Sequence, residues 1–420
     1  MKNIIPFALA LAVILAGSAR AQTYDTNNDV VGTFAGFGFP AYIDGTGRFS
    51  AFSSPGQIVS DTSSNLYVWD SGNNRIRKIT PGAVVTTFAG GGNTVEGYGT
   101  NVSLSWGTVS ALVMDHANKM WLLMTPAYYG SGSWLVNIGT NGYASIANGD
   151  LTNLGSSSGL CFDSANNLYY TGGNRIYRYN PASQVVQAFA GNGVAANFDG
   201  QGPVFSAFNN PTTLACDQAD NLYVWDSGNG TIRRIDQSEN VSTIAGSGVS
   251  YYSADGVGMN ASFSGINAMF ADGYGNIYFA CNGCVRKMDP QTNVVTLAGT
   301  FNQYGGSFSD GPGATATFND ASGGCFSQGI VFVADAGNNR IRDITFNAQP
   351  AMVAPANLQL QTYPGVQING TIGRTYQIQS SPNLSSWNTV ATVLLTSSPF
   401  LWIDSSPANG RQFYRAVMLP

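Results

Sequence analysis

Aspartates in glycine-rich turns are the residues in this chain whose types and spacing best suit chemistry. Three of them open the related segments Asp70-Ser-Gly-Asn-Asn-Arg75, Asp226-Ser-Gly-Asn-Gly230 and Asp335-Ala-Gly-Asn-Asn-Arg340. Four more open Asp-Gly-x-Gly segments, at Asp44, Asp199, Asp255 and Asp310. Carboxylates and backbone carbonyls are ligands for hard cations, so a calcium site is one interpretation. We favour the other, in which Asp and Asn bond to backbone N–H groups in turns and Gly supplies positive φ. We therefore expect no cofactor, with calcium as the alternative.

A second candidate site is an aromatic insertion, Thr125-Pro-Ala-Tyr-Tyr-Gly-Ser-Gly-Ser-Trp134. Tyr128, Tyr129 and Trp134 on such a loop could stack on sugar rings or peptide side chains. The alternative is a loop that packs on its neighbour.

Two of the five cysteines flank an Asn-Gly pair, in the order Cys281-Asn-Gly-Cys284. Asn-Gly is the preferred two-residue turn of a β-hairpin, which brings the two cysteines opposite each other. No βαβ pattern and no second cysteine pair accompany them, so the pattern does not favour redox catalysis or zinc. We predict a disulfide between Cys281 and Cys284, and small buried hydrophobes at Cys161, Cys216 and Cys325.

Residues for catalysis are scarce. The chain has one histidine, His116, which falls in a turn, and two glutamates, Glu96 and Glu239, in loops or turns. No Gly-x-Ser-x-Gly elbow, phosphate-binding loop or dinucleotide-binding motif lies between a predicted strand and a predicted helix. We expect no catalytic residue and no metal ligand, and more readily a binding protein than an enzyme.

An internal repeat positions the candidate residues. Asn65-Leu-Tyr-Val-Trp-Asp-Ser-Gly-Asn-Asn-Arg-Ile-Arg-Lys-Ile79 recurs closely at 221–235 and 331–344, and more weakly at 167–179, 276–288 and 119–138. A complete copy has four strand signals, the last being Val-x-Thr-φ-Ala-Gly. The sixth copy lacks this last segment, and an orphan copy, Val30-Val-Gly-Thr-Phe-Ala-Gly36, precedes the first. We predict an all-β fold, a six-bladed β-propeller with four antiparallel strands per blade. The N-terminal strand would close its last blade.

The Asn-Leu-Tyr-Val-x-Asp-x-Gly-Asn-x-Arg-Ile-Arg string resembles the NHL repeat, over about residues 30–346. The resemblance implies a propeller but no particular activity. Metal-dependent lyases with an NHL-like propeller cannot be matched residue by residue with one histidine. Related gluconolactonase-type propellers hold a divalent metal with acidic and Asn ligands at the channel. A metal-dependent lactonase or hydrolase of that type is the alternative function, and a purely structural envelope protein is another.

The ends of the chain suggest export and a second domain. Lys2, an apolar run and Ala19-Arg-Ala21 are typical of a signal peptide at residues 1–21. The propeller is expected over 29–346, a linker over 347–356 and a small all-β, sandwich-like domain over 357–420. The segment from Gly373 to Trp387 resembles a C-terminal module of secreted bacterial proteins of the verrucomicrobial type, for which anchoring and a stabilising cap are both open roles. We therefore expect a secreted, periplasmic or cell-surface protein.

Composition agrees with many short strands and limits the partners. Charged residues make up 10% of the chain, glycine occurs 51 times and the net charge is −5. An acidic protein disfavours nucleic acid, whose phosphates are neutralised by Lys and Arg. Beyond the signal peptide no apolar run suits stable membrane insertion, and nothing indicates the oligomeric state. Because strands alternate direction, the turns after the second strands and the links after the fourth strands should share one loop-rich face. We predict that this face binds a protein, peptide or glycan. Its candidate residues are Asp44, Asp70, Arg75, Tyr128, Tyr129, Trp134, Asp199, Asp226, Asp255, Asp310, Asp335 and Arg340.

Overall fold

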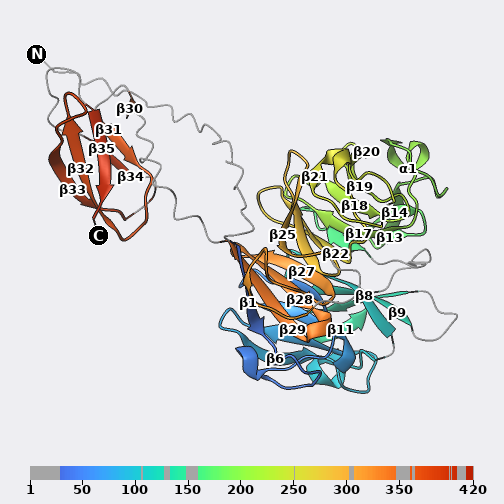
Figure 1. Ribbon diagram of the computed structural model, residues 1–420. Coiled ribbons are helices and arrows are strands. Elements are labelled where there is room, and N and C mark those ends of the chain that lie inside the picture. Colours follow the sequence, from blue (N-terminus) through green and yellow to red (C-terminus); the bar gives the residue numbers. More distant parts are fainter. Residues whose placement is uncertain are drawn as a thin grey trace, which may run out of the picture. The chain divides into compact units, whose positions relative to one another are not determined.

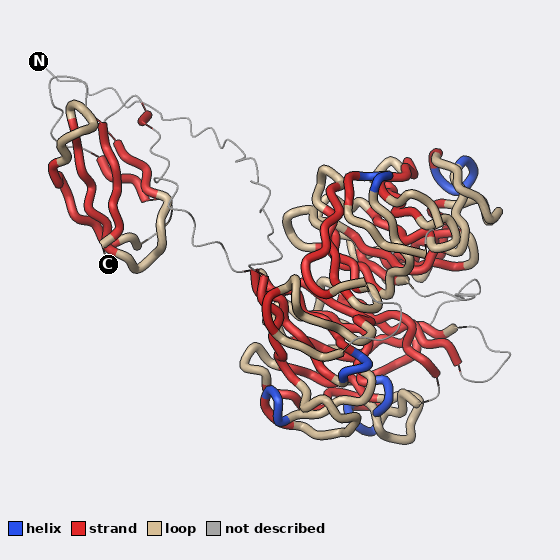
Figure 2. The backbone as a smooth tube through the Cα atoms, in the orientation of Figure 1, coloured by secondary structure: helices blue, strands red, loops and turns tan. Residues whose placement is uncertain are grey.

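The protein was analysed as a computed structural model that describes residues 29–105, 107–126, 133–147, 159–249, 251–301, 307–346, 360–361, 365–396, 398, 400–403 and 413–419. Within these residues strands dominate, and the helical segments are single turns. They are α1(Gly202–Phe205), η1(Gly47–Phe49), η2(Ser71–Asn73), η3(Gly99–Asn101), η4(Gly258–Asn260) and η5(Ala336–Asn338). The chain divides into two compact units, residues 1–346 and 347–420. The predicted all-β fold class is confirmed (Figure 2).

The described part of the first unit contains six antiparallel sheets of four or five strands (Figure 1). The first three, each given in order of strand pairing, are β2(Gly45–Thr46), β6(Val84–Ala89), β5(Arg75–Ile79), β4(Leu66–Asp70), β3(Pro55–Ser60); β7(Gly97–Tyr98), β11(Tyr143–Ile146), β10(Trp134–Ile138), β9(Met120–Pro126), β8(Gly107–Met114); and β12(Leu160–Phe162), β13(Leu168–Gly172), β14(Arg175–Asn180), β15(Val185–Ala190). The fourth and fifth are β16(Gly200–Gln201), β20(Asn240–Ala245), β19(Thr231–Ile235), β18(Leu222–Asp226), β17(Pro211–Cys216); and β21(Gly256–Val257), β25(Asn293–Gly299), β24(Cys284–Met288), β23(Ile277–Ala280), β22(Ala268–Ala271). The sixth is β26(Gly311–Pro312), β1(Asp29–Ala35), β29(Arg340–Phe346), β28(Ile330–Asp335), β27(Ala321–Ser327).

The first strands of the six sheets contact one another in a closed cycle. In order, β3 contacts β8, β8 contacts β12, β12 contacts β17, β17 contacts β22, β22 contacts β27, and β27 contacts β3. Six hydrophobic clusters fill the space between neighbouring sheets. Trp69 and Trp225, which stand beside repeated aspartates, belong to these clusters and are buried. Their indole rings therefore stabilise the packing of sheets.

The N-terminal strand completes the sixth sheet. β1 pairs with β29 from Asp29 opposite Phe346 to Ala35 opposite Ile341. This pairing satisfies the backbone groups of β29 that would otherwise form an open edge. It also joins the two ends of the repeat region across more than 300 residues of sequence, as the orphan segment at 30–36 predicts.

The Asp-Gly-x-Gly segments add a short fifth strand to the outer side of four sheets. Gly45 of β2 pairs with Val85 of β6, and β16, β21 and β26 make the same pairing with the fourth strands of their sheets. In the second sheet β7, from the related Glu96-Gly-Tyr-Gly99, pairs with β11 in the same way. The sequence placed these segments in the links of the loop-rich face but did not predict these strands, whose backbones cover the edges of the fourth strands.

The second unit consists of two three-stranded sheets among its described residues. They are β30(Leu360–Gln361), β31(Gly365–Ile368), β34(Phe400–Ile403), and β33(Asn388–Leu394), β32(Thr375–Ser381), β35(Phe413–Met418). Ile368, Tyr376, Ile378 and Leu395 form its buried core. Across the described residues of the whole chain, no helix has the length and apolar character needed to cross a membrane.

Candidate functional site

The second arginine of the Arg-Ile-Arg pattern organises the candidate aspartates. Arg77, Arg233, Arg286 and Arg342 lie on the third strands and are among the largest fully buried side chains. An isolated buried charge is very costly, so each guanidinium must be paired and hydrogen-bonded. The partners of these arginines decide what the aspartates can do.

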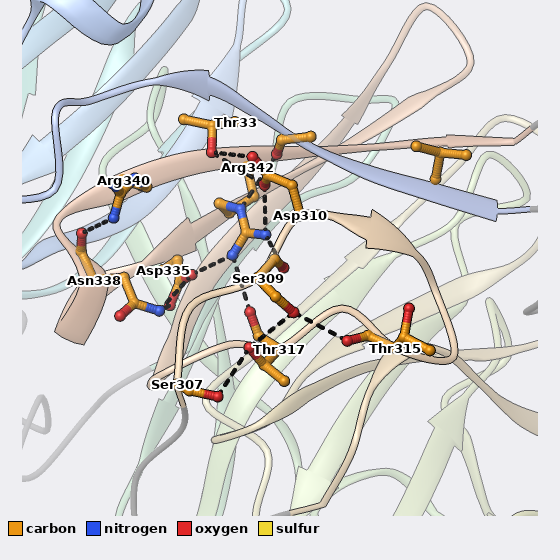
Figure 3. Close-up of polar contacts among 12 residues, drawn as sticks. Thr33, Ser307, Ser309, Asp310, Thr315, Thr317, Asp335, Asn338, Arg340 and Arg342 are labelled. Carbon is orange, nitrogen blue, oxygen red and sulfur yellow. Dashed lines mark hydrogen bonds and ion pairs between the residues drawn. The ribbon is translucent and has the colours of Figure 1, made fainter.

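The sixth sheet shows the arrangement in full (Figure 3). Arg342 Nη1 donates to Asp335 Oδ2 at 2.6 Å and to the Thr317 carbonyl at 3.0 Å. Its Nη2 donates to Asp310 Oδ1 at 2.8 Å and to the Ser309 carbonyl at 2.8 Å. One arginine therefore fastens the turn after the second strand to the segment that becomes the fifth strand.

All seven candidate aspartates are held by these four arginines. Arg77 pairs with Asp70 and Asp44, Arg233 with Asp226 and Asp199, Arg342 with Asp335 and Asp310, and Arg286 with Asp255. We name each such group an Arg–Asp clamp. The interpretation of the aspartates as architecture is favoured over a calcium site, because their oxygens already accept hydrogen bonds. No group of three His, Cys, Asp or Glu side chains that could hold a metal ion occurs among the described residues.

Burial sets the electrostatics of the clamps. It is the largest influence on Asp70, Asp226 and Asp335 and raises the pKa of each carboxyl, although donors from asparagine, backbone and arginine oppose it. Burial acts on Asp199 as well, but hydrogen bonds from Thr243 and Arg233 outweigh it and hold its pKa below the ordinary value. Asp70, Asp226 and Asp335, the inner carboxylates of the clamps, thus depend on their asparagine, backbone and arginine donors to remain charged.

The first arginine of the same pattern has a different environment. Arg75 stacks over the Tyr42 ring at 4.2 Å and donates to the Asn73 carbonyl, while Arg340 stacks over the Phe308 ring at 3.7 Å and donates to the Phe37 carbonyl. Arg175, which the sequence did not single out, donates to the Asn192 carbonyl in the third sheet. Among the described residues these three guanidiniums form no ion pair with a carboxylate. They are therefore cations without a paired carboxylate at the end of the sheets that carries the turns between second and third strands.

The aromatic insertion can be placed only in part. Tyr128 and Tyr129 lie outside the described residues. Trp134 begins β10 and is partly buried, opposite Met124 of β9. It occupies the register of Arg75 in the first sheet, where Arg75 is opposite Asp70. The second sheet thus has Met124 and Val136 in the register of Asp70 and Arg77 of the clamp, and Trp134 in the register of Arg75.

The cysteines are all thiols in the structure. The predicted disulfide between Cys281 and Cys284 is therefore not formed here, and that prediction is corrected. The two residues are opposite each other as predicted, with the Cys281 N–H donating to the Cys284 carbonyl at 2.9 Å. Both are buried in a cluster with Trp225, Ile232 and Phe279.

A cavity of about 280 Å³ lies among the first strands of the six sheets. Leu160, Ala215 and Met269, from three different sheets, are among the residues of its wall. Cys161, Cys216 and Cys325 also border it, and burial raises the pKa of all three thiols, as expected of small apolar residues. His116 lies at its edge and is exposed.

Exposed aromatic side chains gather on the links between sheets. We name the end of the sheets that carries these links, together with the turns between second and third strands, the loop face. Asn73 Nδ2 donates to the Ala41 carbonyl, and Asn229 Nδ2 to the Ala196 carbonyl, which joins the turns to the links. Phe37, Phe39, Phe198, Tyr251 and Tyr252 are exposed in these links. The sequence signal that was missed is the Tyr-Tyr pair within Ser247-Gly-Val-Ser-Tyr-Tyr-Ser253.

Comparisons with known sequences identify partial relatives. No family model matches the chain. A 204-residue alignment, 45% of this chain, is 29% identical to the protein SUPPRESSOR OF QUENCHING 1, chloroplastic, of Arabidopsis thaliana and covers 19% of that protein. A 186-residue alignment, 40% of this chain, is 28% identical to NHL repeat-containing protein 2 of Bos taurus and covers 25% of it. The chain thus spans a quarter or less of the length of these curated relatives.

Solved structures share the fold. A protein of unknown function from Bacteroides thetaiotaomicron matches with a TM-score of 0.59 and 20% identity, over 76% of both chains. An auxiliary nutrient binding protein from the same species matches with a TM-score of 0.57 and 18% identity, over 75% of this chain and 76% of the other. One from Bacteroides ovatus has the same TM-score and identity, over 76% and 77%. The repeat, the sheets and these relatives together define an NHL-type, propeller-like protein.

Proposed function

We propose that this chain is a six-bladed NHL-type β-propeller that binds a protein, peptide or glycan through its loop face. In this proposal residues 1–21 are a signal peptide and direct the chain to the periplasm, the cell surface or the medium. Residues 357–420 form a small sandwich-like domain that tethers the propeller, as the verrucomicrobial-type resemblance of this tail suggests. The closed cycle of first strands supports the count of six blades.

The observation that carries the binding proposal is the exposure of aromatic rings on the loop face. Tyr251 and Tyr252 are 78% and 76% exposed, and Phe37 and Phe39 are 58% and 69% exposed. Exposed apolar side chains that occur together mark interaction sites more often than isolated ones do. Phe37 and Phe39 also contact each other, with ring centroids 5.7 Å apart, and so present one continuous apolar surface.

The links have a composition suited to recognition. Tyr, Ser, Gly and Asn are the residues that predominate in antibody binding loops, because Tyr offers a large rigid ring and the others adaptable hydrogen bonds. The link that contains Tyr251 and Tyr252 consists otherwise mainly of Gly, Ser and Val. Polar recognition groups on this face are the turn asparagines and Arg75, Arg175 and Arg340, because the aspartates are held in the clamps.

Solved structures with this fold include two that are named nutrient binding proteins. Their names assign a binding role to two proteins with this fold. This supports the choice of a binding function for the present chain, without indicating the ligand.

The test is a binding assay with a matched control on the opposite face. The double variant Tyr251→Ala/Tyr252→Ala removes two rings of the loop face. Tyr274→Ala removes a ring that is 68% exposed in the turn between β22 and β23, which emerges at the other end of the strands. Both variants and the wild type are measured against a glycan array, a peptide library and purified envelope polysaccharide.

The proposal predicts a ligand whose saturable binding is weakened at least tenfold by the double variant and unchanged by Tyr274→Ala. A loss of one large buried aromatic contact corresponds to about 1.4 kcal/mol or more, which is tenfold in affinity. Binding that survives the double variant, or that depends on Tyr274 instead, would refute the loop face as the site.

A further inference from the structure

The second sheet carries a pocket on its outer side, away from the loop face. The pocket has a volume of about 290 Å³ and lies where β7 pairs with β11, next to the turn between β10 and β11. Turns between third and fourth strands emerge at the opposite end of the sheets from turns between second and third strands. The pocket is therefore separate from the loop face.

Two tyrosine rings border the pocket. Tyr98 of β7 is opposite Tyr143 of β11, and their ring centroids are 4.8 Å apart at an angle of 63°. The side chains are 58% and 37% exposed, so both rings are accessible to a ligand. The other sheets with a fifth strand have no aromatic pair here; their residues are Thr46–Val84, Gln201–Asn240, Val257–Asn293 and Pro312–Val30.

Lys119 brings a cation to the same pocket. Its ammonium lies over the Trp121 ring, 4.9 Å from the centroid, and forms no ion pair among the described residues. The Asp115 carboxylate accepts instead from the Lys119 backbone N–H and from Trp121 Nε1. In four other sheets the residue just before the second strand is an asparagine, whose side chain donates to the aspartate after the first strand; they are Asn65, Asn167, Asn221 and Asn276.

Asn137 supplies a neutral amide to the pocket. It is 8% exposed, and its Oδ1 accepts a hydrogen bond from Ser145 Oγ at 3.1 Å. Among the described residues its Nδ2 has no partner, so the amide retains a donor for a group in the pocket. Asn137 is opposite Trp121, and the other five sheets have a charged residue in this register, at Lys78, Arg178, Arg234, Lys287 and Asp343.

The third sheet provides an internal comparison. It is hollow at the same place, with a pocket of about 360 Å³ that Asn167, Arg178 and Gln187 border. There the Arg178 guanidinium donates to Gln187 Oε1 at 2.9 Å, and no aromatic ring belongs to the wall. A hollow at this place thus follows from the repeat, whereas the rings, the ammonium and the amide are specific to the second sheet.

We propose that the pocket of the second sheet is a further binding site, which takes a sugar unit with one negative charge, either a carboxylate or a sulfate ester. The tyrosine rings pack against the apolar face of the sugar ring, because tyrosine combines an apolar body with a polar tip. The Asn137 amide donates to a sugar hydroxyl, and the Lys119 ammonium binds the anionic group. This site does not rest on the ligand of the loop face.

The charge and the size of the pocket select this ligand. Lys119 is the one charged side chain among the described residues of the wall, so it matches a singly charged group better than a phosphate ester with a charge of about −1.5 to −2. Ligand pockets usually have volumes of about 300–1,000 Å³. A pocket at the lower end of this range suits one unit of an oligosaccharide, with the rest of the chain in solvent.

The experiment uses the full-length protein and substitutions that other sheets already contain. Tyr98→Thr/Tyr143→Val introduces the pair of the first sheet, and Lys119→Asn introduces the asparagine of four sheets. Tyr251→Ala/Tyr252→Ala is the control on the loop face. Oligogalacturonate, a sulfated galactan oligosaccharide and a neutral galactan oligosaccharide of equal length are titrated by calorimetry. Unfolding midpoints verify that each variant is folded.

We expect the wild type to bind one of the two anionic oligosaccharides at one site per chain, at least about tenfold tighter than the neutral one, as a hydrogen bond to a charged group allows. The probe that binds distinguishes carboxylate from sulfate. Lys119→Asn should abolish this preference, the tyrosine double variant should weaken binding at least about tenfold, and the loop-face variant should bind like the wild type.

Three results would overturn the inference. They are no binding of either anionic oligosaccharide, equal affinity for the neutral one, and unchanged affinity in a folded Lys119→Asn variant. Loss of binding in the loop-face variant alone would assign the oligosaccharide to the loop face and likewise refute the pocket. A negative result at the pocket leaves the loop face untouched, because the two sites are changed by different variants.

Discussion

The Arg–Asp clamp of the fourth sheet allows a quantitative test of the role given to the aspartates. Arg233 donates to Asp226 at 2.9 Å, to Asp199 at 2.7 Å and to the carbonyls of Ala207 and Phe198 at 3.0 and 2.9 Å. Arg233→Met keeps most of the side-chain volume but leaves the fully buried Asp226 carboxylate without its cation. Removal of one partner of a buried ion pair lowers the free energy of unfolding by about 3–5 kcal/mol. We expect a loss in this range, and a similar one for Asp226→Met.

The double variant Asp226→Met/Arg233→Met distinguishes a clamp from two independent contributions. The second sheet already has Met124 and Val136 at these two positions, both buried, so an apolar pair is compatible with this fold. We expect the double variant to recover about 2–3 kcal/mol relative to the sum of the single losses, within the usual coupling of contacting residues. Urea unfolding of the four proteins provides the free energies. Coupling below about 0.5 kcal/mol would refute the clamp, since it would mean that the two residues stabilise the sheet separately.

Three further predictions concern other parts of the first unit. Burial lowers the pKa of Lys287 to about 8, so below that pH the folded state must hold a buried ammonium. Stability should rise between about pH 8 and 10, where only the unfolded chain keeps this proton, and Lys287→Met should remove the rise and add about 1–3 kcal/mol at pH 7 in denaturant titrations. Gly91→Ala, at φ +95°, would place its Cβ against the Arg75 guanidinium, whereas Gly248→Ala, at φ +100°, meets open space. Both should lose about 1–2 kcal/mol for the backbone, and Gly91→Ala about 1–3 kcal/mol more, measured by thermal unfolding. A protein that lacks residues 1–28 should still unfold in one cooperative transition. A protein that lacks residues 1–35, and with them β1(Asp29–Ala35), should not, because β29 would become an open edge.

The repeat made the fold of the first unit predictable. Val30–Gly36 is a copy of a fourth strand with no sheet of its own, and only the sixth copy lacks such a strand. The pairing of β1 with β29 follows from that mismatch. The alternation of polar and apolar residues, together with the turn residues, was sufficient to predict the strands. Each copy repeats the same signals, so a strand that is unclear in one copy can be recognised from the others.

The placement of the Asp-Gly-x-Gly segments could not be predicted in the same way. Their residues fit a turn as well as a strand, and two-residue strands such as β2 carry no periodicity that would distinguish them. What fixes their position is a tertiary contact, the bond from Arg77 to Asp44, which joins residues 33 apart in sequence. The sequence contained a hint in the recurrence of the second arginine of Arg-Ile-Arg, which four of the six copies keep, at Arg77, Arg233, Arg286 and Arg342. An alternating strand predicts which side faces the core, but a buried arginine contradicts the usual assignment of charge to solvent.

The role of the candidate site residues could not be predicted from the sequence either, because it also depends on tertiary contacts. Asp70, Asp226 and Asp335 attracted attention because they recur, and recurrence is what a structural clamp requires of every sheet that contains it. The residues that differ between sheets are more informative about function. In the second sheet Met124 and Val136 replace the buried aspartate and the arginine of the clamp together, so the exchange leaves neither of them unpaired.

The fifth sheet makes a different exchange. It keeps Arg286 and Asp255 but changes the inner carboxylate to Cys281. Arg286 remains paired one to one with Asp255 and also donates to the carbonyls of Ser262 and Ala254, so the exchange leaves no buried charge unpaired. A neutral side chain can therefore stand in the place of the buried aspartate where the second aspartate of the clamp is kept.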